Sequence, residues 1–156
     1  MGKWWGQGRD VITFPIAPVV ASRARVTRWA TYFPKKYQAF RDEFKKLLTT
    51  YDATPTDALL YVKLDFHVQM AKSWSKKKKK TKDGQYCDSN ADLDNYVKAA
   101  LDSLEGKYYD NDNQIVMLRA RKYWAVDGHI NFTMEKIDEW TTSNWFIKWH
   151  KQVYLH

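Results

Sequence analysis

A group of carboxylates in a basic chain is the feature that most clearly suggests chemistry. The chain carries a formal net charge of +8, yet six acids lie close together in its sequence. These are Asp92, Asp94, Asp102, Glu105, Asp110 and Asp112, with a lone lysine, Lys98, among them. Converging carboxylates need a compensating cation, and their oxygens suit Mg²⁺, which also binds phosphate oxygens. These residue types therefore suit metal-assisted hydrolysis of a phosphodiester, in which the metal activates water and stabilises the developing charge.

The spacing of these residues suggests how some of them could meet. Apolar residues recur at helical intervals over residues 92–104, so we expect a helix there with Asp92 and Asp94 at its start. Asp94 and Lys98 are four residues apart and share one face of that helix. If the strand that begins at Gln114 runs back along the helix, Asp112 approaches the helix N-terminus. Lys98 could then orient the attacking water or stabilise charge in the transition state.

A purely structural interpretation of the same residues stays open. Aspartate at a helix start is a common cap and interacts favourably with the helix dipole. The sequence DNDN at 110–113 is common in turns, and Asp94 with Lys98 is an ordinary surface pair. A calcium-binding loop of the EF-hand type is excluded, because DNDNQI lacks the glycine and the closing glutamate of such a loop.

The rest of the chain must supply the elements that position these residues. We expect strands over 11–18, 58–70, 114–126 and 129–135, and helices over 34–50 and 92–104. The Asp127–Gly128 pair between the last two strands predicts a hairpin. Residues 20–33 are interpreted as irregular and the lysine-rich residues 72–82 as a loop.

The order β-α-β-α-β-β predicts an α/β (α+β) fold, in which a single domain contains a mixed β-sheet flanked by helices. The last residues, 136–156, include Trp140, Trp145 and Trp149 and are interpreted as a Trp-rich C-terminal extension. Its spacing permits a helix.

Composition limits the classes of function. The chain has 156 residues, of which 44% are hydrophobic and 16% aromatic, so it can build a core and is not disordered. It has no apolar run long enough for a membrane span, and its first residues lack a signal-peptide core. A single cysteine, Cys87, allows no internal disulfide or cysteine-based zinc site and favours a reducing cytoplasm. The positive charge favours a polyanionic partner such as nucleic acid.

The segment DLDNYVKAALDSLEGKYYDNDNQI combines several elements at fixed spacing. It has an Asp-x-Asp-Asn helix start, a lysine four residues after the second aspartate, and an acidic turn that closes on Gln-Ile. This pattern resembles that of the RusA-type Holliday junction resolvases. The resemblance covers about residues 10–135, and SRARVTRWATYFPKKYQAFRDEF and SWSKKKKK are similar to bacteriophage members, which suggests a phage- or prophage-encoded protein in a bacterial cytoplasm.

The resemblance implies a homodimer that binds four-way DNA junctions and uses Mg²⁺, or Mn²⁺ in its place, to make paired nicks in opposing strands. Its metal-binding aspartates fall on Asp92, Asp94 and Asp112, and its essential lysine on Lys98. Asp112 is preferred to Asp110 because the family's acid lies two residues before the glutamine. The family usually has an acid just before that aspartate, whereas this chain has Asn111, which leaves the choice between Asp110 and Asp112 open.

Basic and aromatic residues outside the acidic segment are candidates for DNA contacts. Arginines suit bidentate phosphate contacts, lysines neutralise phosphates, and an aromatic ring can stack on a base. The candidates are Arg23, Arg25, Arg28, Lys76, Lys77, Lys78, Lys79, Lys80 and Trp74, the last as a wedge at the junction centre. The alternative for the lysine run is a solvated loop.

We therefore predict an Mg²⁺-dependent endodeoxyribonuclease that resolves Holliday junctions, with no small-molecule cofactor and no membrane partner. Two alternatives remain. One is a nuclease of the same chemistry that acts on flaps or forks, and the other is a catalytically silent protein that binds junctions.

Overall fold

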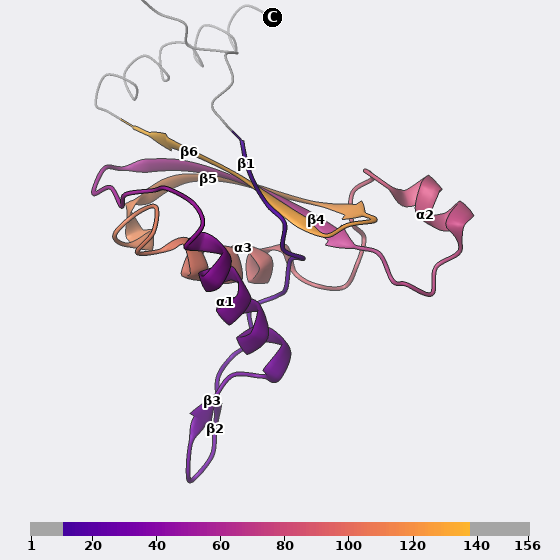
Figure 1. Cartoon of the computed structure of the whole chain (residues 1–156), viewed down its shortest axis with the longest axis horizontal. Coiled ribbons are helices and arrows are strands. Elements are labelled where there is room, and N and C mark those ends of the chain that lie inside the picture. Colours follow the sequence, from indigo (N-terminus) through magenta and orange to yellow (C-terminus); the bar gives the residue numbers. More distant parts are fainter. Residues whose placement is uncertain (1–10, 138–156) are drawn as a thin grey trace, which may run out of the picture.

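The structure, a computed structural model, describes residues 11–137 and is built on one mixed β-sheet (Figure 1). The sheet has the strand order β1-β6-β4-β5, with β5 parallel to β4 and β6 antiparallel to it. Its strands are β1 (Ile12–Phe14), β4 (Leu60–Gln69), β5 (Ile115–Ala125) and β6 (His129–Lys136). The predicted fold class is confirmed. The Trp-rich extension lies outside the described residues.

Two of the three helices lie against one face of this sheet (Figure 1). They are α1 (Lys35–Leu48) and α3 (Leu93–Leu104), close to the ranges expected from their apolar spacing. The third helix, α2 (Lys76–Lys82), lies beyond the end of β4. None of the helices within residues 11–137 has the length and apolar character that a membrane span requires.

The core forms between the sheet and these two helices. Alternate residues of β4 are buried, as the period-two pattern predicts. They pack against one row of buried side chains from each helix. Phe14 of β1 adds an aromatic ring whose centre lies 5.1 Å from the ring centre of Phe44. The buried residues of these elements are Leu60, Val62, Leu64, Phe66 and Val68 of β4, Tyr37, Phe40, Phe44 and Leu48 of α1, and Tyr96, Ala99, Ala100 and Leu104 of α3.

The opposite face of β4 is polar and its charges are paired. The Arg121 guanidinium binds both carboxylate oxygens of Asp65, at 2.8 and 3.0 Å, and this holds the pKa of Asp65 below its ordinary value. The Lys63 ammonium lies 2.9 Å from a carboxylate oxygen of Glu135. Cross-strand pairs of this kind favour the observed register, because a slip by one residue would bury these charges.

The predicted Asp127–Gly128 hairpin is wrong. The turn exists, but β4 lies between β5 and β6, so the two strands it joins do not pair. Gly128 has no left-handed backbone, which a tight hairpin turn with glycine would use. It is required for space instead, because a Cβ at this position would lie 2.7 Å from the Cβ of Ala17 and 3.2 Å from that of Gln69.

Two segments expected to lack regular structure contain short elements. Residues 20–33 include a hairpin of β2 (Arg25–Val26) and β3 (Thr31–Tyr32). The lysine-rich segment forms α2, although like charges disfavour a helix there. The Ser75 side chain caps this helix by accepting a hydrogen bond from the Lys78 backbone N–H.

Gly128→Ala should destabilise the fold, because the added methyl group meets the backbone of Ala17 as well as its side chain. We expect the free energy of unfolding to fall by about 1–3 kcal/mol, the usual range for overpacking. Urea titration followed by circular dichroism would measure it. Val126→Ala, at a half-exposed position in the same turn, is the control and should change stability by less than about 0.5 kcal/mol. Equal stability of the two variants would contradict the close packing at Gly128.

Candidate active site

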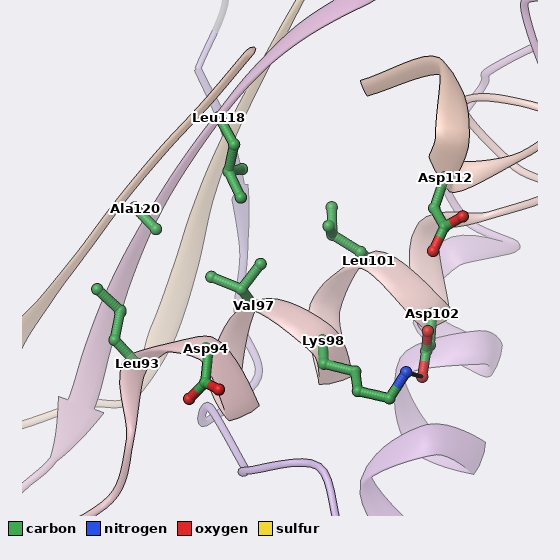
Figure 2. Close-up of a pocket in the computed structure, with 9 residues that line it drawn as sticks. All are labelled: Leu93, Asp94, Val97, Lys98, Leu101, Asp102, Asp112, Leu118 and Ala120. Atoms are coloured by element: carbon green, nitrogen blue, oxygen red, sulfur yellow. Dashed lines mark ion pairs between the residues drawn. The ribbon is translucent and has the colours of Figure 1, made fainter. Parts of the chain in front are cut away.

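Helix α3 presents two neighbouring rows of side chains, each spaced by four residues (Figure 2). One row is apolar and points toward Leu118 and Ala120 of β5. The next row is charged and consists of Asp94, Lys98 and Asp102. Together with Asp112 these two rows enclose an open hollow of about 420 Å³. Its lining residues are Leu93, Asp94, Val97, Lys98, Leu101, Asp102, Asp112, Leu118 and Ala120.

The start of α3 positions two of the predicted metal ligands. Asp94 is exposed in the first turn, and its Oδ1 accepts a hydrogen bond of 2.9 Å from the Asn95 backbone N–H. Asp92 is the residue at the N-cap position, but its side chain makes no capping hydrogen bond. The structural interpretation of Asp92 as a side-chain cap is therefore wrong. Asp92 is exposed and is not among the residues that line the hollow.

Asp112 is held by a short 3₁₀ turn, η1 (Asp112–Gln114), immediately before β5. The Asn111 side chain accepts a hydrogen bond of 3.0 Å from the Asn113 backbone N–H. Gln114 is buried, and its Oε1 accepts a hydrogen bond of 2.7 Å from the Asn111 backbone N–H. Its Nε2 donates to the carbonyl oxygens of Thr56 and Ala58, at 2.7 and 2.9 Å. A buried glutamine thus fixes the turn that carries Asp112.

The expected approach of Asp112 to the helix N-terminus is wrong. Its backbone N–H donates to Glu105 Oε2 at 3.2 Å, and Glu105 is the C-cap residue that follows α3. In Figure 2 Asp112 lies beside Leu101 and Asp102, whereas Asp94 lies at the other end of the row. The carboxylates of Asp94 and Asp112 face one hollow from its two ends.

Lys98 occupies the middle of the charged row. Its Nζ lies 3.8 Å from Asp102 Oδ2, so its ion pair is with Asp102 and not with Asp94 (Figure 2). The Lys98 side chain is 67% exposed, which weakens this pair and leaves the ammonium able to contact a ligand. Asp102 also lies near α1, where burial first and the charge of Asp102 second raise the pKa of Tyr37.

Tyr109 is fully buried next to the last turn of α3. Its hydroxyl donates to the Leu101 carbonyl at 2.7 Å. Burial raises the pKa of this hydroxyl far above its ordinary value, and the charges of Glu105, Asp112 and Asp102 raise it further. Tyr109 therefore stays a neutral donor and links the last turn of α3 to the segment that leads to Asp112.

The residues present suit a divalent cation in chemistry, but they do not form a closed metal cage. Within residues 11–137, no three acidic, histidine or cysteine side chains are grouped so that they could hold an ion. Mg²⁺ commonly uses one or two carboxylates together with water and substrate phosphates. Asp94 and Asp112 can supply such oxygens to the hollow, and so the metal assignment of Asp92, Asp94 and Asp112 stays a prediction.

The predicted DNA-binding residues lie on two elements outside this hollow. Arg23, Arg25 and Arg28 are exposed in and next to the β2–β3 hairpin. Lys76, Lys77, Lys78 and Lys80 are exposed on α2, whereas Lys79 is half-buried and its Nζ donates to the Lys72 carbonyl at 3.1 Å. Their exposure is compatible with phosphate contacts, which stay a prediction.

The structure gives the two aromatic residues nearest these basic elements different environments. Trp74 is half-buried, with its ring 5.0 Å from that of Trp124 and the Lys78 Nζ 3.9 Å from its own ring centre. Trp29, which is not among the predicted DNA contacts, is 85% exposed. The sequence offered one signal for Trp29, its position directly after Arg28 in a basic segment.

Gln114→Leu should loosen the turn that carries Asp112, because the Ala58 carbonyl and the Asn111 N–H lose their partner and the Thr56 carbonyl keeps only the hydrogen bond of 3.3 Å from the Asp110 N–H. We expect a loss of about 1–3 kcal/mol in the free energy of unfolding, measured by urea titration. Asn113→Ala changes an exposed side chain of the same turn and should alter stability by less than about 0.5 kcal/mol. An unchanged midpoint for Gln114→Leu would show that the turn does not depend on this glutamine.

Comparison with protein-family models identifies the family of this chain. The family model described as endodeoxyribonuclease RusA matches residues 15–135, which include α3, η1, β4, β5 and all of β6 except its last residue, whereas β1 lies before the match. A search of curated proteins found no match. The family match covers most of the chain and includes both ends of the hollow. The chain belongs to the RusA family of endodeoxyribonucleases.

Proposed function

We propose that this protein is an Mg²⁺-dependent endodeoxyribonuclease that resolves Holliday junctions by paired, symmetric nicks. The observation that supports this proposal best is the hollow beside α3, which is lined by three carboxylates and an exposed ammonium, in a chain of the RusA family. Because the substrate is branched DNA from recombination, we propose that the enzyme acts in the cytoplasm of a bacterial host.

We propose Asp94 and Asp112 as metal ligands, with Asp92 able to contribute from the N-cap position. Because Asp94 and Asp112 face the hollow from its two ends, both could bind one ion only if binding of the ion or of DNA drew them together. Bound there, Mg²⁺ supplies an activated water and neutralises charge on the scissile phosphate. Both carboxylates are exposed, and the hollow is open enough for a phosphate group to complete the coordination. Asp110 is exposed but does not line the hollow, which favours Asp112 over Asp110 as the second ligand.

Lys98 is suited to act on the phosphate directly. Its ammonium lies in the same row as Asp94 and lines the same hollow. An ammonium there can orient the attacking water or stabilise the charge that develops on the phosphate oxygens. Asp102, 3.8 Å away, would hold the lysine side chain in position until DNA binds.

We propose that two basic elements outside this hollow bring DNA to it. The arginines of the β2–β3 hairpin can form bidentate phosphate contacts, and the lysines of α2 can neutralise phosphates without regard to sequence. Their contributions should be sensitive to salt, because each neutralised phosphate releases condensed counterions.

A homodimer would place two such sites on one junction, as two symmetric cuts require. The support is an apolar strip beside the hollow. Leu118 and Val116 of β5 are 45% and 53% exposed. Within the described part of the chain, the first half of β5 has a partner strand on one side only, whereas residues 84–87 bond to its second half at Lys122–Trp124. A partly exposed apolar edge of this kind is a common site of subunit contact.

Asp94→Asn tests the catalytic assignment. It removes a charge needed for the metal, so nicking of a synthetic four-way junction in Mg²⁺ should fall by at least about 100-fold, as expected for loss of an electrostatic contribution of this size. Binding in a gel-shift assay should persist or tighten, because repulsion of phosphate is relieved. Asp52→Asn, at an exposed position outside the hollow, is the matched control and should cut normally.

The wild-type result separates the proposal from its alternatives. Paired nicks at the junction support it. Cleavage of flaps or forks with an intact junction would indicate a broader branched-DNA nuclease, and binding with no Mg²⁺-dependent cleavage would indicate a silent junction-binding protein. Equal cutting by wild type and Asp94→Asn would remove Asp94 from the mechanism.

Val116→Glu tests the dimer contact, because Val116 belongs to the apolar strip and does not line the hollow. A charge on the apolar strip should convert dimers to monomers at micromolar concentration, which light scattering after size-exclusion chromatography would measure. Paired nicking should fall with it, because one subunit supplies one site. Val126→Glu introduces the same charge at an equally exposed position in the β5–β6 turn and should leave the mass unchanged. A wild-type protein that is monomeric with or without junction DNA would overturn the dimer proposal.

A further inference from the structure

The β2–β3 hairpin projects away from the rest of the molecule (Figure 1). Its strands pair Arg25 with Tyr32 and Val26 with Thr31, and residues 27–30 form the tip. Every residue from Arg25 to Tyr32 is exposed, so the hairpin does not pack into the core of the described chain. The hairpin is therefore an arm and not a part of the packed domain.

The tip of this arm is ordered by Thr27. The Thr27 backbone N–H donates to the Ala30 carbonyl at 2.8 Å, and its Oγ1 donates to the same carbonyl at 3.0 Å. The Oγ1 also accepts from the backbone N–H of Ala30 at 3.0 Å and of Trp29 at 3.4 Å. A preformed turn holds the next two side chains, Arg28 and Trp29, at the end of the arm at a low entropic cost for binding.

Trp29 is the largest apolar side chain that the described chain presents to water, with 85% of its surface exposed. The Arg28 guanidinium lies 5.1 Å from the ring centre of Trp29, which leaves the ring between a cation and solvent. Arg23 and Arg25 are exposed in the same arm. An indole with flat faces beside several arginines matches the chemistry of a base next to phosphates.

Both ends of the arm are anchored next to the proposed active site. On one side the Ala21 backbone N–H donates to the Asn95 carbonyl at 2.8 Å, and Asn95 directly follows Asp94. On the other side Phe33 packs edge-on against Tyr37 of α1 at 5.4 Å. The Arg41 guanidinium covers Phe33 at 4.7 Å. Any DNA held by the tip is thus held by a segment tied to the helix that carries Asp94.

We propose that Trp29 stacks on an unpaired base at the branch point of the DNA, while Arg28 and Arg25 contact the flanking phosphates. The proposal rests on the proposed function and names how that site selects branched DNA. Unpaired or easily unstacked bases occur at a branch point and not within a regular duplex, so stacking by Trp29 would favour branched substrates.

A contact with a second copy of the chain is the competing use of this arm. The charge of the arm argues against it, because exposed arginines alternate with Val26, Trp29 and Tyr32, and the apolar side chains form no continuous patch without charge. The core of a subunit interface is depleted of charged residues.

Affinity for a four-way junction, measured by fluorescence anisotropy at several salt concentrations, tests the proposal. Trp29→Ala should weaken binding by between about 5-fold and about 150-fold, the range for loss of one stacked base, with no change in the salt slope. Trp29→Phe should restore most of the affinity. Arg28→Ala should instead reduce the salt slope by about one. Tyr86→Ala, which removes another exposed aromatic side chain from a different element, is the matched control and should bind as wild type.

A junction with 2-aminopurine at the branch point gives a second readout. Wild type and Arg28→Ala at saturating protein should change its fluorescence, and Trp29→Ala should not. The proposal would be overturned if Trp29→Ala bound the junction with wild-type affinity, or if it lost as much affinity for plain duplex as for the junction. Dissociation of a dimer in Trp29→Ala, seen by light scattering, would also overturn it. A wild-type protein that binds the junction but never cuts it would overturn the proposed function and leave this inference standing.

Discussion

The parallel pairing of β4 with β5 is the constraint on which the remaining structure depends. Parallel neighbours need a crossover that returns the chain along the whole length of the sheet. Residues 70–114 make this return, and α3 supplies most of its length across the buried face. The chain therefore leaves α3 at the same end of the sheet at which it enters β5, and the segment between them carries Asp112.

This connectivity explains the form of the site. The start of α3 and the start of β5 lie at opposite ends of the helix, so the two carboxylates that they carry face one hollow from its two ends. The apolar row that packs toward β5 and the charged row beside it follow from the same helix, because residues four apart share a face. A core helix thus displays the charged groups, and Gln114 fixes the turn at the far end.

The sequence predicts most elements of this fold and fewer of their pairings. Period-two and helical patterns reveal β4, α1 and α3, because each buries one face against a shared core. The Asp127–Gly128 turn led to a wrong prediction of strand pairing, because a local turn signal does not specify whether the two strands that it joins lie side by side. The helix α2 could not be expected from a run of lysines, because its stability depends on the Ser75 cap and on contacts of Lys79 and Trp74.

Within the site, too, the sequence predicts local placement but not the contacts that depend on tertiary structure. Asp94 and Lys98 could be placed on one helix face from their spacing alone. The position of Asp112 could not, because it depends on the direction in which β5 leaves the turn. Trp29 could not be separated from Trp74 by sequence, since both lie beside basic residues and only tertiary packing makes one half-buried and the other exposed.

The cap of the 3₁₀ turn has a consequence for how this enzyme could diverge. Asn111 orders the turn through its side-chain oxygen, which accepts from the Asn113 N–H, and through its backbone N–H, which donates to Gln114. An aspartate offers the same acceptor and the same backbone group. Asparagine and aspartate are therefore interchangeable for folding at this position, while they differ by a full charge next to Asp112. Position 111 can therefore change the local electrostatic potential without changing the hydrogen bonds that order this turn.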